Sequence, residues 1–378
     1  MKFFHLSDLH LGKRLCEYSL IDDQQYILAR VLDAVDSVRP DALIIAGDVY
    51  DKPVPTAEAV ALFDDFLSSL AKRQVVTFVI SGNHDSPERI AFGSRLMGAS
   101  GIHMSPVFEG GVEPIRLRDK YGDVCFWLLP FIKPAHVRRV YPEEECVSYT
   151  DAVRIAVSHM PLDAKERNVL VTHQFVTGAT RSESEEISVG GADNVDVTVF
   201  DGFDYVALGH IHGPQSIGRE AVRYCGTPLK YSFSEADHTK SITVVTLEEK
   251  GSVTIDTLPL IQMRDLREIH GSFDALTSGE GCRDAAAGDY LHITLTDEDD
   301  IPEALSRLRA IYPNLMKLDY DNTRTRSAGA LTLSASPETR SPIELFSDFY
   351  KMQNGRELDM ADREYLSELI EKIWRGKV

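Results

Sequence analysis

The chain has little cysteine, no long apolar run and no P-loop motif, and each absence excludes a class of protein. Its five cysteines are scattered through 378 residues without a CxxC pair, which excludes a disulfide scaffold and is typical of reduced thiols in a cytoplasmic protein. No apolar run approaches the length of a membrane span, and the sequence starts directly with a strand-like segment, so we expect no membrane anchor and no signal peptide. Without a GxxxxGK[ST] loop we expect no ATP binding of the P-loop kind.

Positive charge is also scarce, since 59 Asp and Glu stand against 40 Lys and Arg, for a net charge of −19. This balance argues against passive wrapping of nucleic acid. It does not exclude a nucleic-acid enzyme, because bound divalent ions would reverse the local charge of a carboxylate-rich cleft. A partner could also supply basic surface.

The first part of the chain alternates between apolar runs and amphipathic segments. We predict strands at 3–7, 42–46 and 75–80, and helices at 22–38 and 56–72, the second with Thr56 as its N-cap. This β-α-β-α-β order predicts parallel strands with right-handed crossovers, and hence an α/β domain. The later predicted elements are strands at 124–129, 169–172 and 205–208, and a hairpin over 242–258 that turns at Lys250-Gly251.

The character of the sequence changes near 258–265. Beyond that point we predict a small α/β unit with a strand at 290–296, a helix at 302–311 and a strand at 316–320, followed by a polar linker at 323–336. Two amphipathic helices, 342–353 and 360–374, then predict a terminal hairpin. The hairpin is too short for a core of its own, so we expect it to pack on the body of the protein or on a partner.

Five of the predicted strands end in side chains that bind metal or phosphate. These endings are Asp8 and His10, Asp48 and Asp51, Asn83-His84-Asp85, His173, and His210 and His212. Ligands bind at the carboxyl ends of strands in open α/β sheets. Because residues two apart on a strand share a face, we expect Asp8 to point with His10, and His210 with His212.

Each ending has a plainer explanation. Asp51 suits a turn, a single histidine such as His173 can be a hydrogen-bonded core residue, and Gly82–Asp85 could be a capped turn before a helix, with Gly82 letting the chain turn. Five such endings together favour a metal site of mixed oxygen and nitrogen donors, large enough for two divalent ions. Carboxylates with imidazoles suit manganese, iron or zinc, and the lack of cysteine argues against structural zinc.

In their order, these motifs resemble those of the calcineurin-like metallophosphoesterases. The resemblance implies a β-sandwich flanked by helices in four layers, α/β/β/α. It implies one ion held by Asp8, His10, Asp48 and His212, and a second held by Asp48, Asn83, His173 and His210. The implied catalytic residues are His84, which would protonate the leaving oxygen, and Asp85, which would orient a neighbour.

The wider chain resembles the SbcD family, the nuclease subunits of the bacterial SbcCD exonuclease complexes. The segments that carry this resemblance are 5–12, 187–191, 203–210, 226–233 and 345–355. It implies manganese-dependent hydrolysis of DNA, as a 3′→5′ exonuclease on duplex ends and an endonuclease on single strands or hairpins, in DNA repair, recombination and replication. The alternatives are a small-molecule or cyclic-nucleotide phosphodiesterase and a non-enzymatic DNA tether.

The resemblance also implies a domain plan and partners. The plan is a nuclease domain at 1–262, a DNA-capping α/β domain at 263–335 and a helical hairpin at 336–378. The hairpin would bind a coiled-coil ATPase of the SbcC kind, in a heterotetramer that contains a homodimer of this chain and lies in the bacterial cytoplasm near the nucleoid. Candidate contacts to phosphate or DNA are Asp51, Lys13, Arg14, Arg89 and Arg95. Archaeal and eukaryotic relatives carry a histidine where this chain has Asp51, so no phosphate-positioning imidazole is assumed there.

Overall fold

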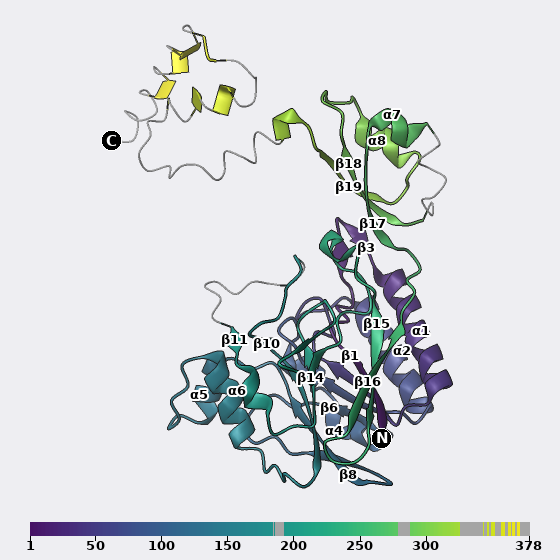
Figure 1. Cartoon of the computed structure of the whole chain (residues 1–378), viewed down its shortest axis with the longest axis vertical. Coiled ribbons are helices and arrows are strands. Elements are labelled where there is room, and N and C mark those ends of the chain that lie inside the picture. The colour runs from purple at the N-terminus through teal and green to yellow at the C-terminus, as the bar shows by residue number, and fades with distance from the viewer. Residues whose placement is uncertain are drawn as a thin grey trace. The chain divides into compact units, whose positions relative to one another are not determined.

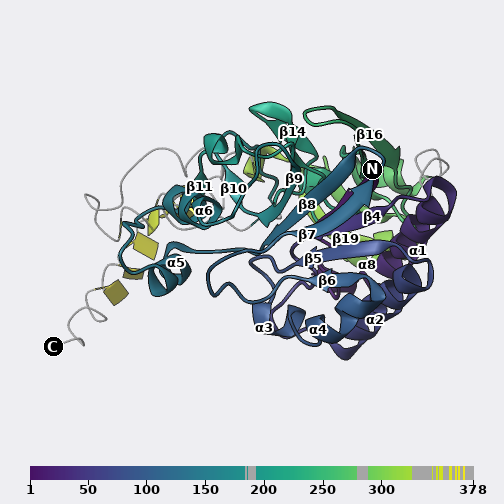
Figure 2. The same cartoon turned by 90° about the horizontal axis from the view of Figure 1, so that it is seen from below.

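The chain divides into two compact units (Figures 1 and 2). The units are Met1–Leu266 and Arg267–Val378. The computed structural model describes residues 1–183, 185, 193–278, 288–325, 343, 346, 347, 349–351, 357–359, 362, 363, 365, 366, 369 and 370.

Two six-stranded sheets form the frame of the first unit. The first sheet has the order β16-β15-β1-β4-β5-β6, with the bounds Val253–Pro259, Ser241–Leu247, Lys2–Leu6, Ala42–Ala46, Val76–Ile80 and Ile102–Met104. The second has the order β13-β14-β12-β9-β8-β7, with the bounds Gln215–Ile217, Arg219–Tyr224, Tyr205–Gly209, Arg167–His173, Gly122–Leu129 and Ile115–Asp119. Strands β1, β4, β5 and β6 run parallel, as do β14, β12, β9 and β8. Their carboxyl ends therefore lie along one edge of each sheet.

The two sheets pack face to face because alternate side chains of their strands are apolar. Phe3, Ile44 and Phe78 of the first sheet share a buried core with Phe126 and Val171 of the second. The rings of Phe78 and Phe126 stack with their centroids 4.4 Å apart. Strand β4 is buried at every position, as expected of a parallel strand that is covered on both faces.

Helices cover the outer faces of the sandwich (Figures 1 and 2). The first sheet is covered by α1, Ile21–Val38, and α2, Ala57–Lys72, which starts after the predicted N-cap Thr56. The second sheet shares its outer core with α5, Pro134–Val140, and α6, Tyr149–Ser158. The predicted α/β class and the helix-flanked sandwich are confirmed, as is the β15–β16 hairpin with its turn at Lys250-Gly251.

Short elements fill the connections of the first unit. They are the strands β2, Arg14–Leu15, β3, Tyr18–Ser19, β10, Phe175–Val176, and β11, Asn194–Val195, the helices α3, Pro87–Ile90, and α4, Ser94–Met97, and the 3-10 turns η1, Gly98–Ser100, η2, Val197–Phe200, and η3, Phe233–Glu235. Two of these connections adjoin predicted ligands, because α3 and α4 follow the β5 ending and η3 lies behind His212.

The second unit contains a three-stranded sheet with two helices. Its sheet has the order β17-β18-β19, with the bounds Leu266–Gly271, Tyr290–Leu295 and Leu315–Tyr320, and its helices are α7, Phe273–Thr277, and α8, Ala304–Arg309. Phe273, Ile293 and Leu308 lie in its separate core. The predicted strands and helix correspond to β18, α8 and β19, whereas β17 and α7 were not predicted from the sequence.

The terminal segment is described only in part. The described residues within 342–353 and 360–374 are helical, in agreement with the two predicted helices. The break at Asn354-Gly355, the packing of the hairpin and the segment 187–191 lie outside the described residues. Among the residues that are described, no helix is both long and apolar enough to cross a bilayer.

Candidate metal centre

The predicted ligands come together where the carboxyl ends of the two sheets meet. The ligand atoms lie within 4.8 Å of one another in each of three overlapping groups, namely Asp8 with His10 and His212, Asp8 with Asp48 and His173, and His10 with Asp48 and His84. Asn83 joins them through its side-chain oxygen, which contacts His173 and His210. The endings of β1, β4, β5, β9 and β12 therefore form one site rather than five separate turns.

One side of this site is built around two facing imidazoles. The Nε2 atoms of His10 and His212 are 3.3 Å apart, and His10 Nε2 is 3.8 Å from Asp48 Oδ2. All three side chains are buried. Two imidazole nitrogens that point at each other and at a carboxylate can share one cation placed between them.

The other side is built around Asn83. Its Oδ1 atom is 2.9 Å from His173 Nε2 and 2.9 Å from His210 Nδ1. His173 Nδ1 donates to the Ala46 carbonyl over 2.9 Å, so in the neutral ring Nε2 carries a lone pair. That lone pair faces two acceptor oxygens, those of Asn83 and, at 3.3 Å, Asp48. The arrangement is repulsive unless the ring is protonated or a cation lies between the three atoms, so the donor set fits a bound metal.

The pKa shifts around Asp48 indicate that burying these charged side chains without a bound cation costs free energy. Burial lowers the pKa of His173, but the carboxylates of Asp48 and Asp8 and the hydrogen bond to Ala46 together outweigh burial and raise that pKa to about 9. Burial likewise opposes ionisation of Asp48, yet His173 and His10 hold its pKa well below the ordinary range. Burial raises the pKa of Asp8, although both its oxygens accept from the His210 N–H at 3.1 Å. Divalent cations would stabilise both carboxylates as anions.

The plain explanation of the histidines as ordinary core residues is disfavoured by their convergence. Within the described part of the chain, His10 Nδ1 and His210 Nε2 are buried without a hydrogen-bond partner, but so is Nε2 of His5, which lies outside the three ligand groups. The shared contacts with Asp8, Asp48 and Asn83 therefore distinguish the site histidines, rather than the missing partners.

The backbone conformation that brings these side chains together differs from the predicted one, in which Asp8 and His10, and His210 and His212, share a strand face. Asp8 and His10 do not share a strand face, because β1 ends at Leu6, and His210 follows the end of β12. Instead the backbone turns to positive φ at Asp8 (53°), His10 (43°), Asp48 (47°) and His210 (104°). Positive φ is uncommon for residues with a Cβ and is concentrated at functional sites.

Two glycines allow the sheet edges to approach so closely. A Cβ at Gly209 would lie 1.8 Å from the Ala46 carbonyl oxygen, and a Cβ at Gly82 would lie 2.1 Å from Asp48 Oδ1. Gly82 is not among the residues with positive φ. Its lack of a side chain therefore serves the close approach of Asp48, not the sharp turn that we predicted.

Asp85 lies behind the ligands and joins two of their loops. Its carboxylate accepts from the main-chain N–H groups of Val49, Tyr50 and Gly82 at 3.1, 2.9 and 2.9 Å. Burial and the negative charge of Asp48 raise the pKa of Asp85 to about 7, against the effect of these donors. Asp85 thus fixes the Asp48 loop against the Asn83 loop, as expected of a positioning residue.

His84 differs from the buried ligands in its exposure. Its side chain is 18% exposed, against 3% for Asp48. His84 Nδ1 is 3.0 Å from the Asp51 carbonyl and donates to it, so Nε2 faces the site, 4.0 Å from Asp48 Oδ2. The ring is placed beside the ligand groups with one nitrogen open toward the centre.

Among the predicted phosphate contacts, Lys13 and Asp51 reach the site. Lys13 Nζ is 2.8 Å from Asp51 Oδ1, which is 3.8 Å from His10 Nδ1. Arg14 instead donates to the Glu17 carbonyl within the β2–β3 hairpin. Arg89 and Arg95 are exposed on the short helices α3 and α4.

The sequence analysis missed the residues that support His212. Glu235 Oε1 is 3.2 Å from His212 Nδ1, and Glu235 Oε2 pairs with Lys240 Nζ at 2.6 Å. Lys240 also donates to the His212 carbonyl at 3.1 Å, and Glu185 accepts from the His212 N–H at 2.5 Å. Burial opposes the charge on Glu235, but His212 and Lys240 hold its pKa below the ordinary range. Glu235 follows a turn rather than a strand, so the strand-end pattern could not indicate it.

Comparison with known proteins agrees with this centre. The profile of the calcineurin-like phosphoesterase family matches residues 1–214, and that of the type 5 capsule protein repressor C-terminal domain matches residues 262–354. The chain is 29% identical to the SbcD subunit of the SbcCD nuclease of Staphylococcus epidermidis over 380 residues, 99% of each protein. It is 31% identical to the SbcD subunit of the SbcCD nuclease of Staphylococcus saprophyticus over 322 residues, 84% of each.

Among solved structures, this chain is similar to a dimetal phosphatase from Danio rerio, with 12% identity and a TM-score of 0.40. The superposition covers 69% of this chain and 96% of the phosphatase chain. So loose a superposition supports no inference about this chain.

Proposed function

The chain belongs to the calcineurin-like phosphoesterase family, among the relatives of the SbcD nuclease subunits, and on that premise we propose how it acts on DNA. It is the nuclease subunit of a complex, and a metal-dependent phosphodiester hydrolase. We propose that it uses Mn²⁺, degrades duplex ends 3′→5′ and cuts single strands and hairpins. The observation that carries the proposal is the convergence of five strand endings on one buried donor set, with His84 beside it.

The proposed ligand sets follow the two sides of the centre. One ion would be held by Asp8, His10, Asp48 and His212, and the other by Asp48, Asn83, His173 and His210. Divalent ions bound there would stabilise the charge that develops on the attacking and leaving oxygens at phosphorus. Asp48 faces both groups of donors, and it would therefore serve as the shared ligand.

His84 is proposed to protonate the leaving oxygen. The Nδ1 atom of His84 donates to the Asp51 carbonyl. Its Nε2 atom therefore faces Asp48, and a proton on Nε2 would point toward the metal centre. Proton transfer by a positioned side chain contributes about 10²–10⁴-fold to a rate. Asp85 has no such access, because its oxygens are occupied by three main-chain donors. It acts by holding the loops in place.

Lys13 is proposed to contact a DNA phosphate beside the centre. It has a carboxylate partner in Asp51 at 2.8 Å, which keeps the ammonium group in place before substrate binds. An incoming phosphate offers a second anion to the same ammonium group. The remaining candidates, Arg14, Arg89 and Arg95, would contact DNA only at a distance from the reaction.

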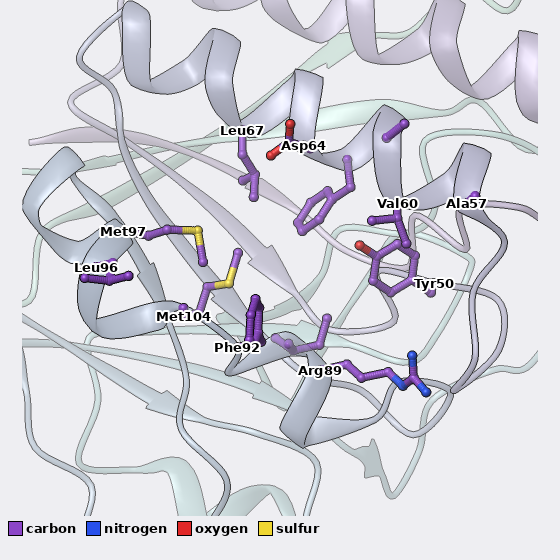
Figure 3. A pocket seen from close by; sticks show the side chains of 14 residues that line it. Tyr50, Ala57, Val60, Asp64, Leu67, Arg89, Phe92, Leu96, Met97 and Met104 are labelled. Carbon is purple, nitrogen blue, oxygen red and sulfur yellow. The ribbon is translucent and has the colours of Figure 1, made fainter.

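The proposed homodimer has a candidate surface on α2, α3 and α4 of the first unit (Figure 3). A pocket of about 710 Å³ lies between these helices, with a mainly apolar lining that includes Phe63, Leu67 and Met104. Two other lining residues, Phe92 and Leu96, are each 82% exposed and form the outer edge of the pocket. A surface that carries both apolar projections and an apolar hollow can be complementary to a second copy of itself around a two-fold axis.

We propose that Phe92→Asp and Leu96→Asp each convert the dimer to a monomer, measured by light scattering of the eluting protein. Arg95→Asp, which changes charge on the same helix without removing an apolar side chain, is the matched control. A dimer that survives both apolar substitutions would place the interface elsewhere.

The second unit and the terminal segment supply the other proposed partners. The α/β unit is proposed to cap DNA, and the terminal helices to bind an SbcC-like coiled-coil ATPase. Deleting residues 342–378 should abolish co-purification with that ATPase while both metal ions are retained. A complex that survives the deletion would contradict the docking proposal.

The decisive experiment compares substrates. The full-length chain with Mn²⁺, alone and with its ATPase partner, is incubated with end-labelled duplex DNA, hairpin DNA and cyclic nucleotides. We expect shortening from the 3′ ends and opening of hairpins. Turnover of cyclic nucleotides without DNA cleavage would instead support a small-molecule phosphodiesterase, and metal binding without any turnover would support a tether.

A further inference from the structure

A second, smaller pocket opens directly beside the metal centre. It has a volume of about 280 Å³ and lies between the loops that follow β5, β6 and β8 and the helix α5. Asn83, whose oxygen contacts His173 and His210, forms part of its wall. On α5 and the loop before it, the wall is formed by Phe131, Lys133 and Arg139. The proposed function assigns no role to these three side chains.

Phe131 offers an aromatic surface at a fixed place. Its main-chain N–H donates to the Ser81 carbonyl at 2.9 Å, which ties the loop to the end of β5. Its ring stands edge-on to the His173 ring, with centroids 6.2 Å apart, and it is only partly buried. The Lys133 ammonium lies 5.7 Å from the ring centroid. An aromatic ring in this position can stack on a nucleobase, and every base has a face that permits stacking.

Positive charge gathers at the same pocket. Lys133 and Arg139 are exposed, and neither forms an ion pair with a carboxylate within the described residues, although the Lys133 ammonium lies over the Phe131 ring. The pKa of His136, which also lines the pocket, is lowered by burial and then by the charges of Lys133 and Arg139. Two acids also line the pocket. Glu88 is exposed and accepts from the Ser86 hydroxyl at 2.8 Å, and Asp85 is buried with its oxygens held by main-chain N–H groups. In a chain with a net charge of −19, unpaired cations beside the centre favour an anionic ligand.

We propose that this pocket binds one deoxynucleotide of the DNA strand, next to the phosphodiester that is cut. Phe131 stacks on the base, and Lys133 and Arg139 bind the adjoining phosphate. The volume of about 280 Å³ lies just below the range for drug-sized ligand pockets, about 300–1,000 Å³, which limits the occupant to about one nucleotide. Because Asn83 forms part of the wall, a base seated on Phe131 fixes the position of the strand relative to the metal ligands. The inference rests on the proposed function and assigns a place to the substrate.

The test measures binding rather than turnover. The full-length chain loaded with Mn²⁺ is titrated in a calorimeter with deoxyadenosine 5′-monophosphate and, separately, with inorganic phosphate. Neither ligand contains the phosphodiester bond that the proposed activity cuts, and release of inorganic phosphate from the nucleotide is measured beside the titration. We expect the nucleotide to bind the wild type more tightly than phosphate does. Phe131→Leu should abolish that difference, a loss of about tenfold in nucleotide affinity.

A second variant and a matched control keep the test independent of Phe131. Lys133→Gln combined with Arg139→Gln should weaken nucleotide binding about tenfold and reduce its dependence on salt. Arg138→Gln removes one positive charge next to Arg139 on α5, but Arg138 donates to the Cys146 carbonyl and does not line the pocket. It should bind the nucleotide like the wild type. Equal affinities for nucleotide and phosphate in the wild type, or unchanged nucleotide binding in both pocket variants, would overturn the assignment.

A short phosphorothioate single strand, which resists cleavage, distinguishes a DNA strand from a free nucleotide. Its affinity should fall in the same variants, and an affinity that does not change would overturn the assignment to a strand. DNA cleavage by the wild type is scored separately. Binding that depends on Phe131 without DNA cleavage would contradict the nuclease proposal alone, whereas cleavage with binding independent of Phe131 would contradict the pocket alone.

Discussion

The first sheet gives the metal centre mainly oxygen atoms, from Asp8, Asp48 and Asn83, whereas the second gives imidazole nitrogens, from His173, His210 and His212. The two kinds of donor are also held differently. Asp8 and Asp48 lie in turns with positive φ, and Asp85 ties the Asp48 loop to the first sheet through main-chain N–H groups.

Two imidazoles of the second sheet, those of His173 and His212, are oriented by acceptors behind them. The Ala46 carbonyl accepts from His173, and the Glu235 carboxylate lies 3.2 Å from His212 Nδ1. An acceptor behind an imidazole fixes its tautomer and raises its basicity as a ligand. The difference teaches that turns with positive φ position the carboxylates of Asp8 and Asp48, whereas side-chain hydrogen bonds position the rings of His173 and His212. The two halves should therefore respond differently to substitution.

The largest effect is expected from Asp48, the proposed shared oxygen ligand. Asp48→Asn should lose both ions, and with them about 10⁴-fold in hydrolysis, because metal stabilisation of the transition state is worth several kcal/mol and each 1.4 kcal/mol is tenfold. His212→Asn, on the nitrogen side, should lose one ion and keep the other. Metal content by mass spectrometry, beside turnover of a generic phosphodiester, separates the two. Equal metal loss in both variants would break the distinction between shared and single ligands.

The second-largest effect is expected from His84, which follows a strand of the first sheet but is not assigned as a metal ligand. His84→Gln should retain both ions and lose about 10²–10⁴-fold in cleavage rate, because a proton donor is removed. His84 also lies in one of the groups that could hold metal. A drop in bound metal to the level of Asp48→Asn would show that His84 is a ligand after all.

A smaller effect is expected from the acceptor behind the second sheet. Glu235→Gln should weaken metal affinity about 10–100-fold by releasing His212. It also leaves the buried Lys240 without its counter-charge, which should lower the free energy of unfolding by about 3–5 kcal/mol. Adding Lys240→Met removes the buried charge, and it should restore stability but not metal affinity. If the double variant recovers both, Glu235 acts on stability alone.

The smallest effect on the metal centre is expected from Asp119, which lies at the opposite end of the sheets, where the first and second sheets are joined. There Arg167 Nη1 is 3.1 Å from Asp119 Oδ2 within the second sheet, and it donates to the Glu248 carbonyl at the end of β15 over 2.7 Å. Asp119→Asn should lower the free energy of unfolding by about 1.5–3 kcal/mol and leave metal content unchanged.

The stabilisation by Asp119 should also depend on pH. The hydrogen bond from Arg167 is the main reason that the pKa of Asp119 lies below its ordinary value of 3.8. Its contribution is therefore present above pH 3.8 and is lost as the pH falls below that value. The thermal midpoints of wild type and Asp119→Asn, measured in the presence of a chelator, should converge in acid. A constant gap would assign the effect to packing.

Much of the fold and of the donor set could be predicted, because both rest on local patterns. Parallel strands with buried faces are recognisable as short apolar runs, and the residues after Ala46, Ile80 and Leu208 stand out as polar. The geometry could not be predicted. A sequence does not reveal that Asp8 and His210 adopt positive φ, since that is imposed by packing against the opposite sheet.

Residues brought in by distant contacts were also missed. Glu235 and Lys240 reach His212 across more than one strand connection, and in the sequence they resemble surface charges. Gly82 was recognised as important for the wrong reason, because close approach to Asp48 depends on tertiary packing. In the second unit, β17 and α7 are short elements with weak periodicity.

The strand order of the first sheet has a consequence for folding during synthesis on the ribosome. Strand β1 lies between β4 and β15, and β15 consists of Ser241–Leu247. A chain emerging from the ribosome displays Asp8 and His10 early, but it cannot complete the sheet that carries them until β15 and β16, residues 241–259, have been made. Because domains generally fold as units during synthesis, the metal centre should be inactive on nascent chains that lack these two strands. Activity would then be acquired once the first unit has been made, while the second unit is still being synthesised.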